Sequence, residues 1–218
     1  MSLNEDILDE ALLNAATPKA KDINFPLSLE FKIGTLSNDF IAKDATGVVL
    51  GYVRQKMFKL KEKVDVFTNE SRSHIAYEIK ADKWIDFNTS YYFNNDDQEK
   101  IGRVGRKGMK SIWKASYSVF DHNDEIEFNI TEENPWAKVA DTLLGEIPLL
   151  GILTGYLFNP KYIMKRPDGT EVVRLKKLPS FWGRKFTLEK LSDFKDDLEG
   201  ERALLSFMMM SLLERRRG

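Results

Sequence analysis

Apolar and polar residues alternate in short runs from about residue 27 to residue 130, and turn residues separate the runs. Residues 75–80 alternate cleanly, residues 40–43 lead into the turn 44–47, and residues 126–130 leave the turn 121–124. A period of two is typical of half-buried strands. Regular turns between short β-branched and aromatic runs predict a sheet closed on itself or a sandwich.

A weak internal repeat accompanies this pattern. Residues 50–56 match residues 101–107 at an offset of 51, and a third copy runs from residue 162 to residue 177. Each copy reads as a strand, an acidic or glycine turn, a second strand and a basic end. We interpret the copies as repeated β-hairpins in one sheet.

Helical periodicity appears in two further segments. Ser2 to Glu5 forms a capping box, and Ile7, Leu8, Ala11 and Leu12 lie on one face, which predicts an amphipathic helix over 3–16 and a linker up to residue 20. In the segment 134–158, Asn134 caps, Pro135 starts a helix with an apolar stripe, and a shorter apolar helix follows from residue 148.

The C-terminal segment is apolar on nearly every face from residue 203 to residue 213. Glu199 and Glu201 precede it and three arginines follow it, which suits the helix dipole at both ends. Such a helix is either fully buried or in a membrane. Eleven residues rise only about 16 Å, about half a bilayer core, so we expect burial inside the protein and no transmembrane span.

Composition narrows the function classes. The chain has 218 residues, 42% of them hydrophobic, with 33 Lys and Arg against 34 Asp and Glu. This length suits one domain or two small ones with a sizeable core, and the near-zero net charge argues against a nucleic-acid coat protein. The chain has no cysteine, which excludes disulfides, zinc ribbons and cysteine nucleophiles and fits a cytoplasmic location.

A family resemblance rests on the hairpin at residues 44–56, on residues 101–104 and 116–121, and on the closing helix at about 198–217. Over roughly residues 30–217 the chain resembles the tubby C-terminal-like superfamily, above all its LURP-one-related and phospholipid-scramblase-like members. The resemblance implies a mainly β fold with helices, a closed antiparallel β-barrel of about twelve strands enclosing the hydrophobic C-terminal helix. Residues 21–218 would then form one tubby-like barrel domain, with a helical insertion at 134–158 that is not part of the family's core pattern.

Basic residues gather between residues 100 and 114, whereas residues 121–133 hold six acids and no Lys or Arg. Such asymmetry can create an anion-binding face. We take Arg103, Arg106, Lys107 and Lys110 as the candidate residues for an anionic ligand and expect at least two of them to share a face. The alternative is an ordinary solvated strand edge, where lysine prevents edge pairing.

Motifs for calcium binding, nucleic-acid binding and catalysis fit the sequence poorly. Residues 121–132 imitate a calcium loop, but Ile126 stands where the loop needs glycine. Residues 101–108 imitate the glycine loop of a KH domain, but the preceding residues read as a hairpin turn, so nucleic acid is not an expected partner. His74 and His122 are isolated and no nucleophile-elbow motif is present. We therefore expect no catalysis, no metal and no cofactor.

Tubby proteins bind phosphoinositides and scramblase relatives are tied to membrane lipid, and the resemblance implies no established catalysis. The first hypothesis is accordingly a non-enzymatic binding module for anionic phospholipid or phosphoinositide, peripheral to a membrane. The second is a structural or protein-interaction scaffold that docks partners on the 134–158 insertion. A barrel enzyme or apolar-ligand carrier is the third.

Overall fold

Twelve strands and one helix make up the described part of the chain. The computed structural model describes residues 23–32, 39–55, 63–68, 71–82, 89–106, 116–133, 161–178 and 185–215. The strands are β1 (Leu27–Phe31), β2 (Phe40–Lys43), β3 (Val49–Gln55), β4 (Lys63–Phe67), β5 (Ile75–Ala81), β6 (Ser90–Asn95), β7 (Lys100–Arg106), β8 (Ser116–Phe120), β9 (Ile126–Glu132), β10 (Lys161–Lys165), β11 (Glu171–Leu178) and β12 (Lys185–Lys190). The helix is α4 (Asp197–Arg215).

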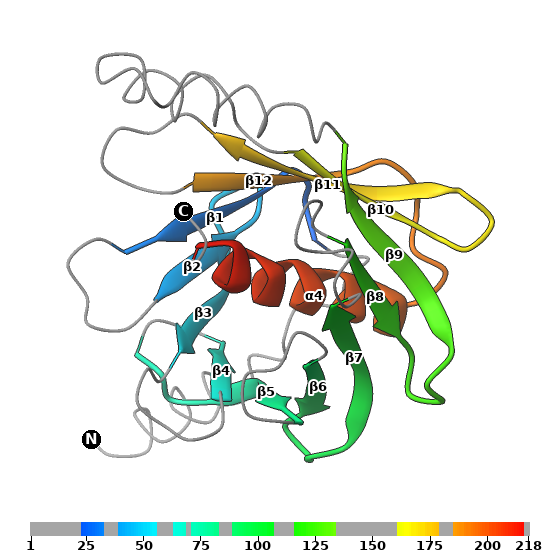
Figure 1. Cartoon of the computed structure of the whole chain (residues 1–218). Helices are drawn as coiled ribbons and strands as arrows, with labels where there is room; N and C mark the ends of the chain where they lie inside the picture. The colour runs from blue at the N-terminus through cyan, green and yellow to red at the C-terminus, as the bar shows by residue number, and fades with distance from the viewer. Residues whose placement is uncertain are drawn as a thin grey trace, which may run out of the picture.

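The strands close into a barrel in which every strand pairs with its neighbour in sequence (Figure 1). All pairs are antiparallel, and β1 closes the ring on β12 with Leu27 opposite Leu188. Closure leaves no exposed sheet edge. The expected closed antiparallel barrel of about twelve strands is confirmed, and the sandwich alternative is wrong.

Four tight turns have the same backbone pattern. In the turns that begin at Asp44, Asn95, Asp121 and Arg166, the backbone nitrogen of the first residue donates to the backbone oxygen of the fifth, and the backbone nitrogen of the fourth donates to the backbone oxygen of the first. The fourth residue has positive φ in each turn: Gly47, Gln98, Asp124 and Gly169. This is a type I turn followed by a left-handed residue, a common connection in hairpins. The turn residues predicted from the sequence are therefore turns for a local steric reason.

The internal repeat has a structural counterpart. Its three copies contain β3, β7 and β11, which are each the second strand of a hairpin and lie four strands apart. The hairpins β2–β3, β6–β7 and β10–β11 each carry a register shift close to the turn. Such bulges increase the local twist and help a sheet to curve. The hairpins β4–β5 and β8–β9, which lie outside the repeat, carry the same kind of shift, so the repeated sequence marks three of five similar hairpins in the wall.

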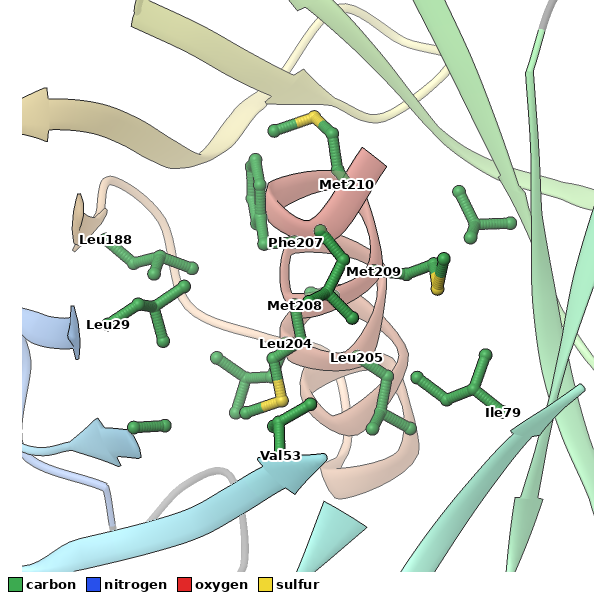
Figure 2. Close-up of a cluster of buried hydrophobic side chains, with 14 of the residues drawn as sticks. Leu29, Val53, Ile79, Leu188, Leu204, Leu205, Phe207, Met208, Met209 and Met210 are labelled. Carbon is green, nitrogen blue, oxygen red and sulfur yellow. The ribbon is translucent and has the colours of Figure 1, made fainter. Parts of the chain in front are cut away.

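Helix α4 lies inside the barrel, as Figure 1 shows in red. Met209, Met210 and Phe207 have no exposed surface, and Met208 is 6% exposed. Figure 2 shows side chains from the wall around the helix, among them Leu29, Val53, Ile79 and Leu188. The prediction of a buried central helix is confirmed, and it begins one residue earlier than expected.

Three expectations concern residues outside the described ranges. These are the N-terminal helix at 3–16, the helical insertion at 134–158, and the side chains of Lys107 and Lys110. They stay predictions.

Because consecutive strands are antiparallel neighbours, their connections alternate between the two ends of the barrel. One end, the hairpin end, has the connections 44–48, 68–74, 96–99, 121–125 and 166–170, together with residues 191–196, which lead into α4. At the other end, the loop end, the chain leaves and re-enters the wall around residues 33–38, 56–62, 83–88, 107–115, 134–160 and 179–184.

Candidate functional site

Arg103, the first candidate for an anionic ligand, is engaged within the protein. Its Nε donates to Asp124 Oδ1 at 2.8 Å, and its Nη1 donates to Ser90 Oγ at 3.2 Å. Its guanidinium carbon lies 3.6 Å from the centre of the Phe120 ring, a close cation–π contact. Only 19% of the side chain is exposed. A ligand at Arg103 would have to compete with this internal carboxylate.

Asp124, in the acidic turn 121–125, pairs with two basic residues of β7. Lys100 Nζ donates to Asp124 Oδ2 at 2.8 Å, and Arg103 binds the other oxygen. These two hydrogen bonds, that of Lys100 first, hold the pKa of Asp124 below its ordinary value. The basic residues of β7 and the acidic residues 121–125 are thus neighbours across the wall, which the sequence shows only as separate charge runs.

Arg106 and Arg103 do not share a face of β7. Residues of a strand alternate between its two faces, so Arg106 lies on the same face as Val104, which is buried in the core. Its cross-strand partner is Tyr117, another core residue. Arg106 is the last residue of β7 and therefore lies at the loop end. The described pair among the four candidates is split between the two faces.

Buried ion pairs attach α4 to the barrel near the hairpin end. Arg166 forms two hydrogen bonds of 2.8 Å to the carboxylate of Glu199 and a third, also 2.8 Å, to the backbone oxygen of Asp193. The Glu199 carboxylate also accepts a hydrogen bond from the backbone nitrogen of Lys195. The hydrogen bond with Glu199 is the main reason that the pKa of Arg166 is raised.

A second pair involves Arg202, one turn further along α4. Its Nε and Nη2 donate to the Glu127 carboxylate at 2.6 and 2.5 Å. The aliphatic part of Arg202 passes over Gly102 of β7, where an added Cβ would lie 2.7 Å from Arg202 Cδ. Sequence reasoning missed both arginines; the available signal was Arg202 at the start of an otherwise apolar helix.

The Tyr77 hydroxyl hydrogen-bonds the carboxylate of Glu201 on α4. Burial is the main cause of the raised pKa of both groups. Both groups therefore keep their protons to a higher pH in the folded protein than they would in water. It adds a polar link between β5 and the helix.

The outer face of the barrel carries a separate apolar cluster, the outer patch, formed by Ile41, Val49, Tyr52 and Phe67. The Tyr52 hydroxyl donates to Asp39 Oδ2 at 2.5 Å and accepts from Arg72 at 3.1 Å. Burial is the first cause of the raised pKa of Tyr52. Sequence reasoning missed this patch, although strands that are apolar at consecutive positions signal burial on both faces.

Within the described ranges, no group of three or more His, Asp or Glu side chains could hold a metal ion. His74 Nε2 lies 3.7 Å from Asp96 Oδ2, and His122 lies in the exposed turn 121–125. Among the same residues, no helix has both the length and the apolar character that crossing a membrane requires.

Comparisons with protein families, curated proteins and solved structures found no match to this chain.

Proposed function

We propose that the chain is a non-enzymatic, tubby- and scramblase-like binding module whose loop end meets anionic phospholipid or phosphoinositide at a membrane surface. The observation that carries this proposal is the unequal chemistry of the two ends of the barrel. The family relationship is part of the proposal, and the closed barrel with an apolar helix inside it agrees with that relationship.

Charged residues are distributed unequally between the connections at the two ends of the barrel. The hairpin-end connections contain eleven Asp and Glu and three Lys and Arg. The loop-end connections contain nine Lys and Arg and four Asp and Glu. An anionic surface therefore repels the first end and attracts the second, although the whole chain has a net charge of only −1.

The tryptophans of the chain are distributed even more unequally between the two sets of connections. All four tryptophans of the chain, Trp84, Trp113, Trp136 and Trp182, belong to four different loop-end connections. Tryptophan favours the membrane–water interface because its ring is largely apolar while its N–H can stay hydrated. Basic residues and tryptophan at the same end of a barrel are the combination that an interfacial contact with anionic lipid needs.

The filled interior supports binding at an end of the barrel. Side chains of α4 and of the wall form one continuous core from Leu27 to Leu212, in which Phe207, Met209 and Met210 are fully buried. A lipid chain or a substrate inside the barrel would have to displace these side chains. A headgroup bound at the loop end leaves the core intact.

The test is co-sedimentation with vesicles of phosphatidylcholine alone or with an anionic lipid, at low and high salt. The variant Arg106→Ala/Lys107→Ala/Lys110→Ala removes three charges worth about 1 kcal/mol each, so binding should weaken by about a hundredfold. The control Arg103→Ala removes an arginine that is paired with Asp124 and should bind almost as the wild type does.

Binding should also fall with salt and shift tryptophan emission to shorter wavelength. Equal binding by wild type and triple variant, or no wild-type binding at low salt, would contradict the lipid proposal.

The scaffold alternative is favoured by a different observation at the hairpin end. Five large apolar residues at or beside its connections are exposed: Val48, Ile75, Ile126, Leu191 and Leu198. Such residues at an acidic end would suit a protein partner with a basic rim. If vesicles do not bind, self-association measured by sedimentation equilibrium, and its loss in Ile126→Asp, would support a scaffold.

A further inference from the structure

The outer face of β2–β5 is largely buried, and described side chains cover part of it: Lys32 Nζ and Arg72 Cζ lie 5.0 and 4.9 Å from the centre of the Tyr52 ring. Ile41, Tyr52 and Phe67 alternate with core residues and therefore point outward, yet they are 8%, 1% and 8% exposed. Asp65 and Glu78, which lie opposite each other on the same outer face, are 1% and 5% exposed. The described strands form the barrel wall and α4 lies inside it, so no described strand or helix packs over this face, and a further segment would account for the burial of Ile41 and Phe67.

We infer that residues 3–16 of the chain cover the outer patch as an amphipathic helix. Their apolar face, with Ile7, Leu8, Ala11 and Leu12, would pack on Ile41, Val49, Tyr52 and Phe67. Burying an amphipathic face against an apolar sheet face is the usual way in which such a helix is stabilised. The inference is independent of the proposed lipid binding.

The path of the chain before β1 makes this contact reachable. Asn24 donates its side-chain amide to Asp44 at 3.2 Å, and its backbone oxygen accepts from the backbone nitrogen of Ala45 at 2.8 Å. The chain is thus held at the β2–β3 turn just after residue 22, beside the outer patch. A helix of 14 residues is about 21 Å long, and four neighbouring strands span about 15 Å.

Charge complementarity points to the same occupant. Residues 1–16 contain four acids, Glu5, Asp6, Asp9 and Glu10, and no Lys or Arg. On the covered face the acids are buried, whereas the cations around them are partly exposed: the side chain of Lys63 is 31% exposed, that of Arg72 38% and that of Lys80 49%.

Arg54 lies on the same outer face, and its buried Nε has no hydrogen-bond partner. The face therefore has an apolar centre surrounded by partly exposed cations, which pair on their inner side with the buried acids Asp39, Asp65 and Glu78. An acidic amphipathic helix is complementary to such a surface in both respects.

Because the 218 residues of the chain include no cysteine, disulfide cross-linking in the whole chain allows a direct test. The variant Leu8→Cys/Val49→Cys joins the apolar face of the segment to the edge of the outer patch. Mild oxidation with diamide should close an intramolecular disulfide, because a disulfide needs Cα atoms about 4.4–6.8 Å apart and only segments in contact come that close for long. Two matched controls keep one of these cysteines: Asp6→Cys/Val49→Cys uses the opposite face of the helix, and Leu8→Cys/Thr131→Cys uses β9, six strands away around the barrel.

Cross-linking of the first pair at least several-fold faster than of either control would support the inference. Equal rates in all three variants, or disulfides only between two chains, would overturn it; the second result would make another copy the occupant. A second measurement does not depend on disulfide geometry. Val49→Cys should react slowly with a maleimide in the otherwise natural chain and faster when Leu8→Asp is added, and an unchanged rate would also overturn the inference.

Discussion

Single buried charges decide how α4 is held in the barrel. Glu199 and Arg202 would be expensive to bury alone, but each forms a two-bond ion pair with a residue of the wall or its turns. Removing one partner of a pair would leave the other uncompensated, whereas an exposed pair such as Lys185 with Glu30 contributes little. A further acid of α4, Glu201, has a pKa that burial raises.

Glu201→Gln tests this shift. Burial raises the pKa of Glu201 in the folded protein above its ordinary value of 4.5, so the ionised carboxylate lowers the free energy of unfolding at neutral pH. This loss of stability disappears as the pH falls below the pKa of Glu201 in the folded protein, because the folded protein then binds a proton at Glu201 before the unfolded protein does. We expect Glu201→Gln to be more stable than wild type at pH about 7 in urea denaturation, with the difference closing towards pH about 4.5.

The control is Glu171→Gln, because a hydrogen bond from Lys165 lowers the pKa of Glu171. This group stabilises the fold above its ordinary pKa, so its substitution should lower stability at neutral pH. The same sign for both variants would contradict the role of burial at Glu201.

At the scale of elements, the contact between β7 and α4 depends on a residue without a side chain. A Cβ on Gly102 would lie 2.6 Å from the backbone oxygen of Phe120 and 2.7 Å from Arg202 Cδ. The backbone oxygen cannot move away without disturbing β8. Gly102 therefore allows the helix and two strands to approach closely.

Gly102→Ala should consequently destabilise the protein by about 1–3 kcal/mol, the usual cost of overpacking. Gly105→Ala on the same strand is the matched control, because its nearest neighbour is the Ser90 hydroxyl at 3.2 Å, a side-chain atom that can shift slightly while it keeps its hydrogen bond from Arg103. We expect this control to change stability by less than about 1 kcal/mol. Chemical denaturation of the two variants measures the difference, and equal costs would argue against close packing at Gly102.

The interior position of α4 makes a second prediction at this scale. Met208→Asp should cost about 3 kcal/mol or more, because a carboxylate would be buried without a partner. Leu198→Asp is the control on the same helix: its side chain is 44% exposed and lies in the first turn, where the helix dipole favours an acid. Thermal unfolding should separate the two variants clearly, and a Met208→Asp protein as stable as wild type would contradict burial of this face.

At the scale of the whole molecule, closure of the ring does not require the 134–158 insertion. β9 and β10 pair directly, with Glu132 opposite Tyr162, and the backbone nitrogen of Glu133 donates to the backbone oxygen of Lys161 at 2.8 Å. The two ends of the connection are therefore adjacent, and a short turn can replace it.

We expect deletion of residues 134–158, closed by a short glycine linker, to leave a folded barrel. A shorter connection also costs less entropy to close. Far-UV circular dichroism and a cooperative thermal transition are the measurements. Deletion of the β8–β9 hairpin should instead open the ring and abolish cooperative unfolding, and a molten product of the first deletion would show that the insertion contributes to the core.

The local features of this fold were readable from the sequence because each depends on residues close together in the chain. Alternating runs predicted the strands, Asp44 to Gly47 and Arg166 to Gly169 are turns because of their own backbone preferences, and an apolar run too short for a bilayer predicted a buried helix. The number of strands came from a family resemblance, since local patterns do not count the strands of a ring.

Tertiary structure alone decided which of these local features meet. Arg103 read as free for a ligand, but barrel closure brings Asp124 to it from 21 residues away. Arg202 and Glu127 are 75 residues apart, and their pairing depends on a helix entering the barrel. Long-range contacts of this kind depend on the path of the whole chain, so no local pattern in the sequence records them.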